Sequence, residues 1–194
     1  MKTKGVLVAV AVLAITGVAL AGWVRMLDPR GKAVAGEIDG AALVLNGRAF
    51  GAPDPSPEQT ITTSREGLTI QVLANQPPPS PADRGVRILL AAERAGHVNN
   101  RAVIVDVAYT LPRTNPATHL AVSLQGIEPS DWETQALSAA GGRARFALDA
   151  RLAVDALGLR AINETPDAPG AVVINDIRIM PAEAGTADES EAAD

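Results

Sequence analysis

Short runs of alternating apolar and polar residues recur along most of this chain. Between residues 101 and 111, valines and other apolar residues occupy every second position, a spacing that turns one side of a β-strand toward a core. Residues 119–125 and 143–149 alternate in the same way. Less regular runs predict further strands at 43–50, 59–63, 67–74, 86–92, 132–137 and 157–162. So many short strands predict an all-β fold, either a sandwich or a barrel.

The last predicted strand, residues 171–180, changes the phase of its alternation. Its apolar residues fall on even positions up to Ile174 and on odd positions from Ile177 onward. One extra residue inserted into the strand would return both groups to the same face of the sheet. The sequence therefore predicts a β-bulge at Asn175–Asp176.

Glycine and proline mark the connections between these runs. The Gly141–Gly142 pair predicts a hairpin turn before the strand at 143–149. Residues 86–95 and 149–157 each have a helical alternative, the second with Asp149 as its N-cap. Prolines cannot donate backbone hydrogen bonds, so exposed loops are predicted at the proline-rich stretches 52–57 and 77–81.

Residues 5–24 form an apolar stretch without a charge, and about 20 such residues span the hydrocarbon core of a membrane as a helix. As a signal peptide, this stretch would be cut after Ala21. As a permanent anchor, it would end with Trp23 at the outer interface, and the absence of a polar segment before the cleavage site favours this alternative. We expect a single span in the inner membrane with a periplasmic C-terminal domain, or a secreted periplasmic protein after cleavage.

The pattern divides the chain into four parts. Residues 1–24 are the signal anchor or signal peptide, residues 25–40 a linker, residues 41–181 the β-sandwich domain and residues 182–194 an acidic tail. The tail has no large apolar side chain to offset the entropy lost on ordering, so we expect it to be disordered.

Composition narrows the functional classes. The chain has no cysteine, which excludes disulfides, thiolate metal sites and a cysteine nucleophile. Its net charge of −5 comes largely from the acidic tail, and its arginines are scattered singly, so nucleic acid is not an expected partner. His97 and His119 lack metal-ligand spacing, and no nucleotide loop or nucleophile elbow occurs. We therefore expect no catalytic residues, no metal and no cofactor.

Three of the predicted strands carry a family resemblance. They are residues 120–125 (LAVSLQ), 157–160 (LGLR) and 172–181 (VVINDIRIMP). Over residues 43–181 this pattern resembles the jelly-roll modules grouped as galactose-binding-like or carbohydrate-binding domains. The resemblance implies an antiparallel β-sandwich of jelly-roll type, and a non-catalytic module that binds glycans in the bacterial cell envelope.

The candidate binding residues centre on Trp132, which lies between Asp131 and Glu133. On one interpretation, the indole is buried between two solvated acids. On the other, its ring stacks on a sugar while neighbouring polar side chains bind the hydroxyl groups. The predicted ligand-binding set is Trp132, Asp131, Glu133, Gln125, His119, Arg113 and Asn115.

Two other functions stay open from the sequence. The domain would serve as a structural or assembly partner of an inner-membrane complex, such as one for polysaccharide synthesis or export. Alternatively, two carboxylates facing one cleft would make a glycoside-active enzyme. The acids considered for that role are Asp131, Glu133, Asp106 and Asp176.

Overall fold

The computed structural model describes residues 36–72, 78–128, 131–164 and 168–182, which belong to one compact unit within residues 32–194. These residues form eleven β-strands, one 3-10 turn and one short helix. The predicted membrane segment 1–24, most of the predicted linker and the tail after Ala182 lie outside the described residues. Within the part that is described, no helix has the length and hydrophobicity that a membrane span requires.

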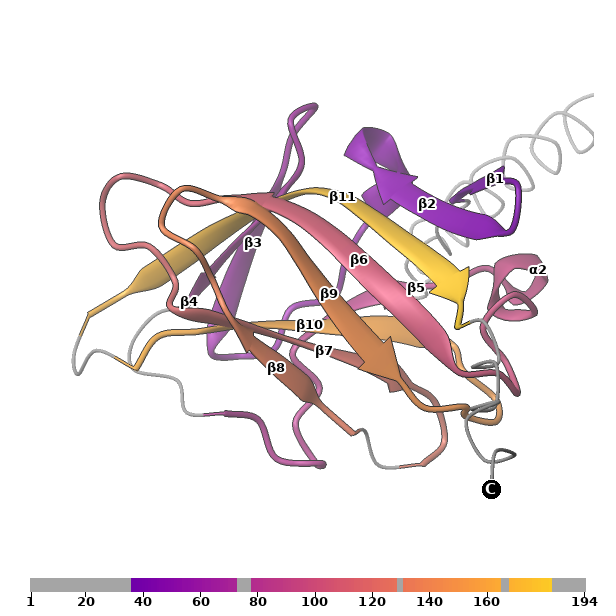
Figure 1. The fold of residues 1–194 in the computed structure, drawn as a ribbon. Helices are drawn as coiled ribbons and strands as arrows, with labels where there is room; N and C mark the ends of the chain where they lie inside the picture. Colours follow the sequence, from indigo (N-terminus) through magenta and orange to yellow (C-terminus); the bar gives the residue numbers. More distant parts are fainter. Residues whose placement is uncertain (1–35, 73–77, 129–130, 165–167, 183–194) are drawn as a thin grey trace, which may run out of the picture. The chain divides into compact units, whose positions relative to one another are not determined.

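The larger sheet has seven strands arranged around the C-terminal strand β11 (Gly170–Pro181). One edge of β11 pairs first with β4 (Leu68–Val72) and then with β2 (Ala42–Asn46), and its other edge pairs with β6 (Val103–Thr110). All of these pairs are antiparallel, and β11, β6 and β9 run side by side in Figure 1. The outer strands are β1 (Glu37–Asp39), β3 (Gln59–Thr63) and β9 (Gly142–Leu148).

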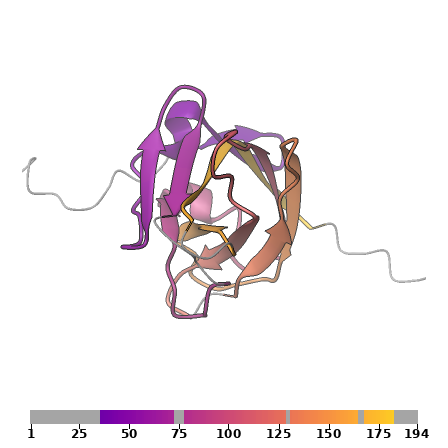
Figure 2. The same cartoon turned by 90° about the vertical axis from the view of Figure 1, so that its left-hand side faces the viewer.

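The smaller sheet has four antiparallel strands in the order β5-β10-β7-β8. Figure 2 shows the strands of both sheets surrounding the interior of the domain. The predicted all-β, antiparallel β-sandwich is therefore confirmed. The four strands are β5 (Val86–Leu89), β7 (His119–Gln125), β8 (Glu133–Ala136) and β10 (Ala156–Ile162).

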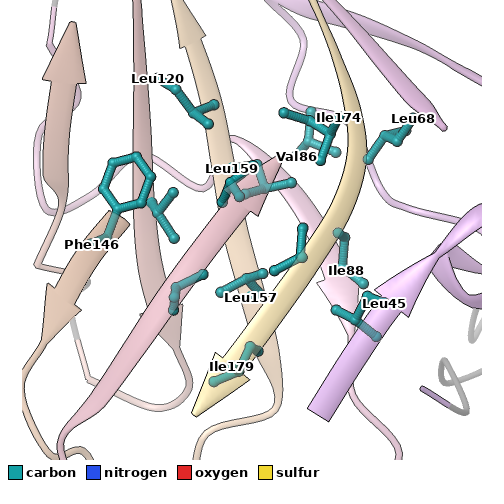
Figure 3. Close-up of a cluster of buried hydrophobic side chains, with 14 of the residues drawn as sticks. Leu45, Leu68, Val86, Ile88, Leu120, Phe146, Leu157, Leu159, Ile174 and Ile179 are labelled. Atoms are coloured by element: carbon teal, nitrogen blue, oxygen red, sulfur yellow. The ribbon is translucent and has the colours of Figure 1, made fainter. Parts of the chain in front are cut away.

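The core lies between the two sheets and consists almost entirely of aliphatic side chains. Leu157 and Leu159 of β10 meet Ile174 and Ile179 of β11 there, as Figure 3 shows. Burying each such side chain contributes about 1.5 to 3 kcal/mol of transfer free energy. Alternation along the strands selects these residues for the core and turns their neighbours to the outer face of each sheet.

The bulge predicted in the last strand is present. The pairing between β11 and β6 shifts its register between Ile174 and Asp176, so Asn175 is the extra residue. As a result Ile174 and Ile177 are both buried in the core, although their sequence parities differ.

The predicted hairpin at Gly141–Gly142 is wrong. These residues connect β8 with β9, but β8 belongs to the smaller sheet and β9 to the larger one. Gly141 and Gly142 have φ of 75° and 139°, values that glycine adopts more readily than other residues. The chain passes from the smaller sheet to the larger one at this point. A glycine pair gives a sharp turn, but local sequence does not determine which strands then pair.

The helical alternatives also fail. Within residues 86–95 only α2 (Ala92–Ala95) is helical, and residues 149–157 contain no helix. The predicted strand at 43–50 ends at Asn46 and continues as a 3-10 turn, η1 (Gly47–Phe50). Strand β1 lies inside the segment predicted as a linker.

Candidate functional site

The two central strands of the smaller sheet, β7 and β10, are buried on both faces. In β7 and β10 the residues turned away from the core are as inaccessible as those within it. They include polar side chains, with Gln125 4% exposed and Arg160 5% exposed. We call this outer side of the smaller sheet, with Ser123, Gln125, Gly158 and Arg160 at its centre, the covered face.

The two proline-rich stretches form the cover. Asp54, in the first stretch, exchanges backbone hydrogen bonds with Arg87 of β5, at 2.9 Å from Asp54 N to Arg87 O and 2.8 Å from Arg87 N to Asp54 O. The second stretch leads into residues 80–85, where the carbonyl oxygen of Arg84 accepts a hydrogen bond from Gln125 Nε2 at 2.8 Å. Both loops are therefore fixed to the sheet by backbone groups.

An ion pair joins the second loop to the centre of the sheet. Arg160 Nη1 lies 3.3 Å from Asp83 Oδ2, and Ser80 N donates to the same carboxylate oxygen at 2.7 Å. Burial raises the pKa of Asp83, but the Ser80 hydrogen bonds and the charge of Arg160 outweigh it, so the pKa lies below its ordinary value of 3.8. Asp83 is thus held as a carboxylate at neutral pH.

Trp132 supports this loop from the side. Its indole is half-buried, lies outside the main core cluster, and has its Cη2 atom 2.9 Å from the position that a Cβ on Gly85 would occupy. Gly85 also has a φ of +58°, so a side chain there would be strained as well as crowded. Within the described residues the buried Trp132 Nε1 has no hydrogen-bond partner.

Gln125 is positioned by a second glycine. A Cβ on Gly158 would lie 2.6 Å from Ser123 Oγ and would collide with the Gln125 amide, which therefore occupies the space above Gly158. The amide donates to Ser123 Oγ at 3.3 Å as well as to the loop. The missing side chain at Gly158 thus allows Gln125 to reach across from β7.

Two pockets open on the covered face, on either side of residues 82–84. The first has a volume of 450 Å³ and is lined by Arg87, Gln125, Glu128 and Asp155, among others. The second has a volume of 290 Å³, and its walls include residues 54–58 and Arg160. The first volume lies within the range of about 300 to 1,000 Å³ that is usual for ligand pockets, and the second lies just below it.

The first pocket contains an ion pair whose aspartate is exposed to solvent and whose arginine is largely buried. Arg87 Nη2 lies 3.1 Å from Asp155 Oδ1, with the arginine side chain 19% exposed and the aspartate 61% exposed. A planar guanidinium held beside a carboxylate presents both donors and acceptors to a ligand.

The predicted binding residues are divided among separate places. Gln125 lines the first pocket, and Trp132 lies beside Gly85. Asp131 and Glu133 are exposed and line a separate hollow of only 20 Å³, where Asp131 pairs with Arg151. The structure therefore does not bring the two acids and the indole to one ligand surface.

The remaining predicted residues lie farther along the domain. His119 begins β7, at the end opposite Gln125, and lies 3.0 Å from Thr118 Oγ1 and 3.8 Å from Glu164. Arg113 and Asn115 are exposed in the loop before β7, where the carbonyl oxygen of Asn115 accepts a hydrogen bond from Ala171 N. The Asn115 hydrogen bond connects the loop to the start of β11.

The second pair of acids considered for catalysis lies on the larger sheet. Asp106 Oδ1 lies 2.9 Å from Arg143 Nε, and Asp176 Oδ2 lies 3.8 Å from Arg143 Nη2. One arginine therefore lies between the two carboxylates. Among the described residues no group of three or more His, Cys, Asp or Glu side chains is placed to hold a metal ion.

Sequence reasoning missed Asp83, Arg87, Arg160 and Asp155. Arg160 follows Gly158 at the outward parity of its strand, so alternation alone places its charge in solvent. A usable signal was the combination of an outward arginine, a glycine two residues before it and two proline-rich loops elsewhere in the chain.

Comparison with known proteins gives similarity at the level of structure only. No family model and no curated protein matches the sequence. The CBM1 domain of BiXyn10A has a TM-score of 0.46 at 8% identity, over 72% of this chain and 96% of that one. A xylan-binding module, CBM15, has a TM-score of 0.47 at 16% identity, over 67% of this chain and 89% of that one. A mutant of Xylanase10C from Cellvibrio japonicus, in complex with xylopentaose, has a TM-score of 0.44 at 17% identity, over 67% of this chain and 26% of that one.

Proposed function

We propose that this domain is a non-catalytic glycan-binding module of the cell envelope, and that the covered face is its binding site. The observation that carries this proposal is the 450 Å³ pocket in which Arg87, Gln125 and Asp155 converge on one space. The guanidinium and the carboxylate together match the adjacent donors and acceptors of sugar hydroxyls, and the buried Gln125 amide holds the loop beside them. They are positioned by a sheet and by loops already fixed to it, so little ordering accompanies binding.

A binding role fits the state of the carboxylates better than a catalytic one. A glycosidase needs two carboxyl groups facing each other across one scissile bond. Here Asp83 and Asp155 each pair with an arginine, and Asp131 pairs with Arg151 away from both pockets. Asp83 and Asp155 therefore serve to orient arginines and to accept hydrogen bonds.

Tethering to the inner membrane through residues 5–24, with the domain in the periplasm, is the second part of the proposal. Its support is the length and apolar character of that stretch. Such an anchor would hold the covered face near newly exported envelope polymers.

A structural role in an envelope complex is the alternative, and one observation favours it. A pocket of 750 Å³ lies on the outer side of the larger sheet, where Ile104, Met180 and Ala42 lie beside Arg145 and Arg178. Apolar and cationic side chains side by side are typical of protein contact surfaces. A partner bound there would leave the covered face free.

A matched pair of arginine variants tests the proposal. The full-length protein in detergent micelles is titrated calorimetrically with a panel of glucose, xylose and galactose oligosaccharides. We expect Arg87→Ala to weaken binding at least tenfold, because it removes the central donor of the first pocket. Arg143→Ala is the control, since Arg143 pairs with Asp106 at 2.9 Å much as Arg87 pairs with Asp155, but on the other sheet.

Equal binding by the wild-type protein and Arg87→Ala would reject the covered face as the site. Absence of binding across the panel, together with co-purification of a membrane complex lost on Met180→Asp, would favour the alternative function. Release of shorter sugars from a bound oligosaccharide would contradict a non-catalytic role.

A further inference from the structure

The two pockets of the covered face are parts of one surface. Residues 82–84 and Arg87 line both of them, so the pockets are neighbours and share a short ridge formed by residues 82–84, just before β5. A ligand confined to one pocket would leave the other side of this ridge without contacts. A chain of linked units would contact both pockets together.

Acidic side chains outnumber basic ones around this surface. Five carboxylates face three guanidinium groups across the two pockets. Two of those arginines are already committed, Arg87 to Asp155 at 3.1 Å and Arg160 to Asp83 at 3.3 Å. The acids left over, which lie on both sides of the ridge, are Asp54 and Glu58 in the second pocket and Glu128 in the first.

Arg84 is the remaining cation of the surface, and within the described ranges it makes no ion pair. One exposed arginine against three exposed acids leaves a local excess of negative charge. An anionic sugar bound across the ridge would bring its own carboxylates close to these acids, and like charges at short range repel. Hydroxyl groups, by contrast, donate hydrogen bonds to carboxylate oxygens without this repulsion.

We infer that the ligand is an uncharged glycan chain that crosses the ridge and occupies both pockets, and that the surplus acids exclude anionic polysaccharides. This inference rests on the proposed function and specifies the class of ligand. Specificity of this kind combines a favourable fit with repulsion of the wrong ligand.

Two series of sugars test the inference on the full-length protein in detergent micelles. The first is a ladder of uncharged oligosaccharides from one to six units, and the second is a ladder of uronic acid oligomers of the same lengths. We expect affinity for the uncharged sugars to rise at least tenfold from the monosaccharide to the longer members. We expect the uronates to bind at least tenfold more weakly at low salt, with the difference narrowing as salt screens the acids.

Two variants assign this discrimination to the surplus acids. Glu58→Gln and Glu128→Gln remove one negative charge from each pocket while keeping a similar shape, so each should reduce the preference for uncharged sugars two- to fivefold. Glu93→Gln is the control, because Glu93 is exposed on α2 and lines neither pocket.

Three outcomes would contradict the inference while leaving the proposed function intact. They are tighter binding of uronates than of uncharged sugars, equal affinity for the monosaccharide and the hexasaccharide, and a preference unchanged in both glutamate variants. Binding of neither series would instead contradict the proposed function, and the inference would fail with it.

Discussion

The outer faces of the two sheets handle charge in opposite ways. On the larger sheet Arg143 and Arg178 alternate with acids, and Arg178 lies 3.5 Å from both Asp39 and Asp176. We call this outer side of the larger sheet, from Asp39 through Arg178 and Asp176 to Arg143 and Asp106, the open face. Arg143 and Arg178 are 50% and 43% exposed, so water reaches most of the network. On the covered face the central arginine is almost completely buried.

The charges of the open face are therefore solvated, whereas the central charge of the covered face is fixed by its partners. Exposed ion pairs contribute little free energy, with a median of about 0 to 1 kcal/mol. A buried guanidinium loses its hydration, so its partners must be in the right place before the fold is stable. The loops that supply those partners also form the pockets, which links stability to binding on the covered face alone.

Two glycines in the left-handed region should show the largest contrast. Gly85 and Gly40 have φ of +58° and +60°, but a Cβ on Gly85 would collide with Leu159 O and Trp132, whereas one on Gly40 would meet nothing within 4 Å. We expect Gly85→Ala to lower the free energy of unfolding by about 3 kcal/mol and Gly40→Ala by about 1 kcal/mol. Urea denaturation followed by circular dichroism measures both. Equal losses would mean that the close approach of the loop to Trp132 does not stabilise the fold.

Removing an arginine from each face should give the next largest effect. We expect Arg160→Ala to cost about 2 kcal/mol, because it removes an almost fully buried side chain that attaches the loop to the sheet through Asp83. Arg178→Ala on the open face should cost about 0.5 kcal/mol or less. Chemical denaturation at matched ionic strength compares the two variants. A larger loss for Arg178→Ala would reverse the distinction between the two faces.

Substitution of Trp132 tests whether the loop over the covered face depends on its contact with the indole. We expect Trp132→Ala to destabilise the protein by about 1 to 2 kcal/mol and to weaken glycan binding, because the loop at Gly85 loses its neighbour. Trp132→Phe should recover part of both losses, since a smaller ring still contacts the loop. If binding falls in the alanine variant while stability stays unchanged, the indole contacts the ligand directly instead.

The smallest expected effect concerns the stability of the fold at acidic pH. The pKa of Asp83 is lowered in the folded chain, so its ion pair stabilises the fold above about pH 4, and this contribution is lost as the pH falls through the folded pKa. Asp83→Asn should therefore make stability less dependent on pH between about 5 and 3. Thermal unfolding across that range, with Asp39→Asn as the open-face control, measures the change. An identical acid dependence in both variants would show no special role for Asp83.

The alternation of residues predicted most of the strands, because burial of one sheet face imposes a period of two that is visible locally. Even the bulge at Asn175 follows from this period. The pairing of strands was harder to predict from the sequence. The Gly141–Gly142 connection illustrates this, because the same local pattern fits either a hairpin or a change of sheet. Strand β1 escaped prediction because its three residues are all exposed.

The site was predicted only in part, for a related physical reason. Gln125 and Trp132 were identified from their own strands, and both lie at or beside the covered face. Arg160 was overlooked because an outward-facing residue looks solvated unless the covering loop is known. That loop lies far away in the chain, and its contact with Arg160 is a property of the folded domain.

Amide hydrogen exchange of the full-length protein, with and without an uncharged oligosaccharide, tests the central claim most directly. We predict slower exchange on binding in residues 52–58, 80–89 and 125–128, which surround the two pockets, and no change in β6, β9 or β11. Protection confined to β6, β9 and β11 would place the ligand on the larger sheet and contradict the assignment of the covered face.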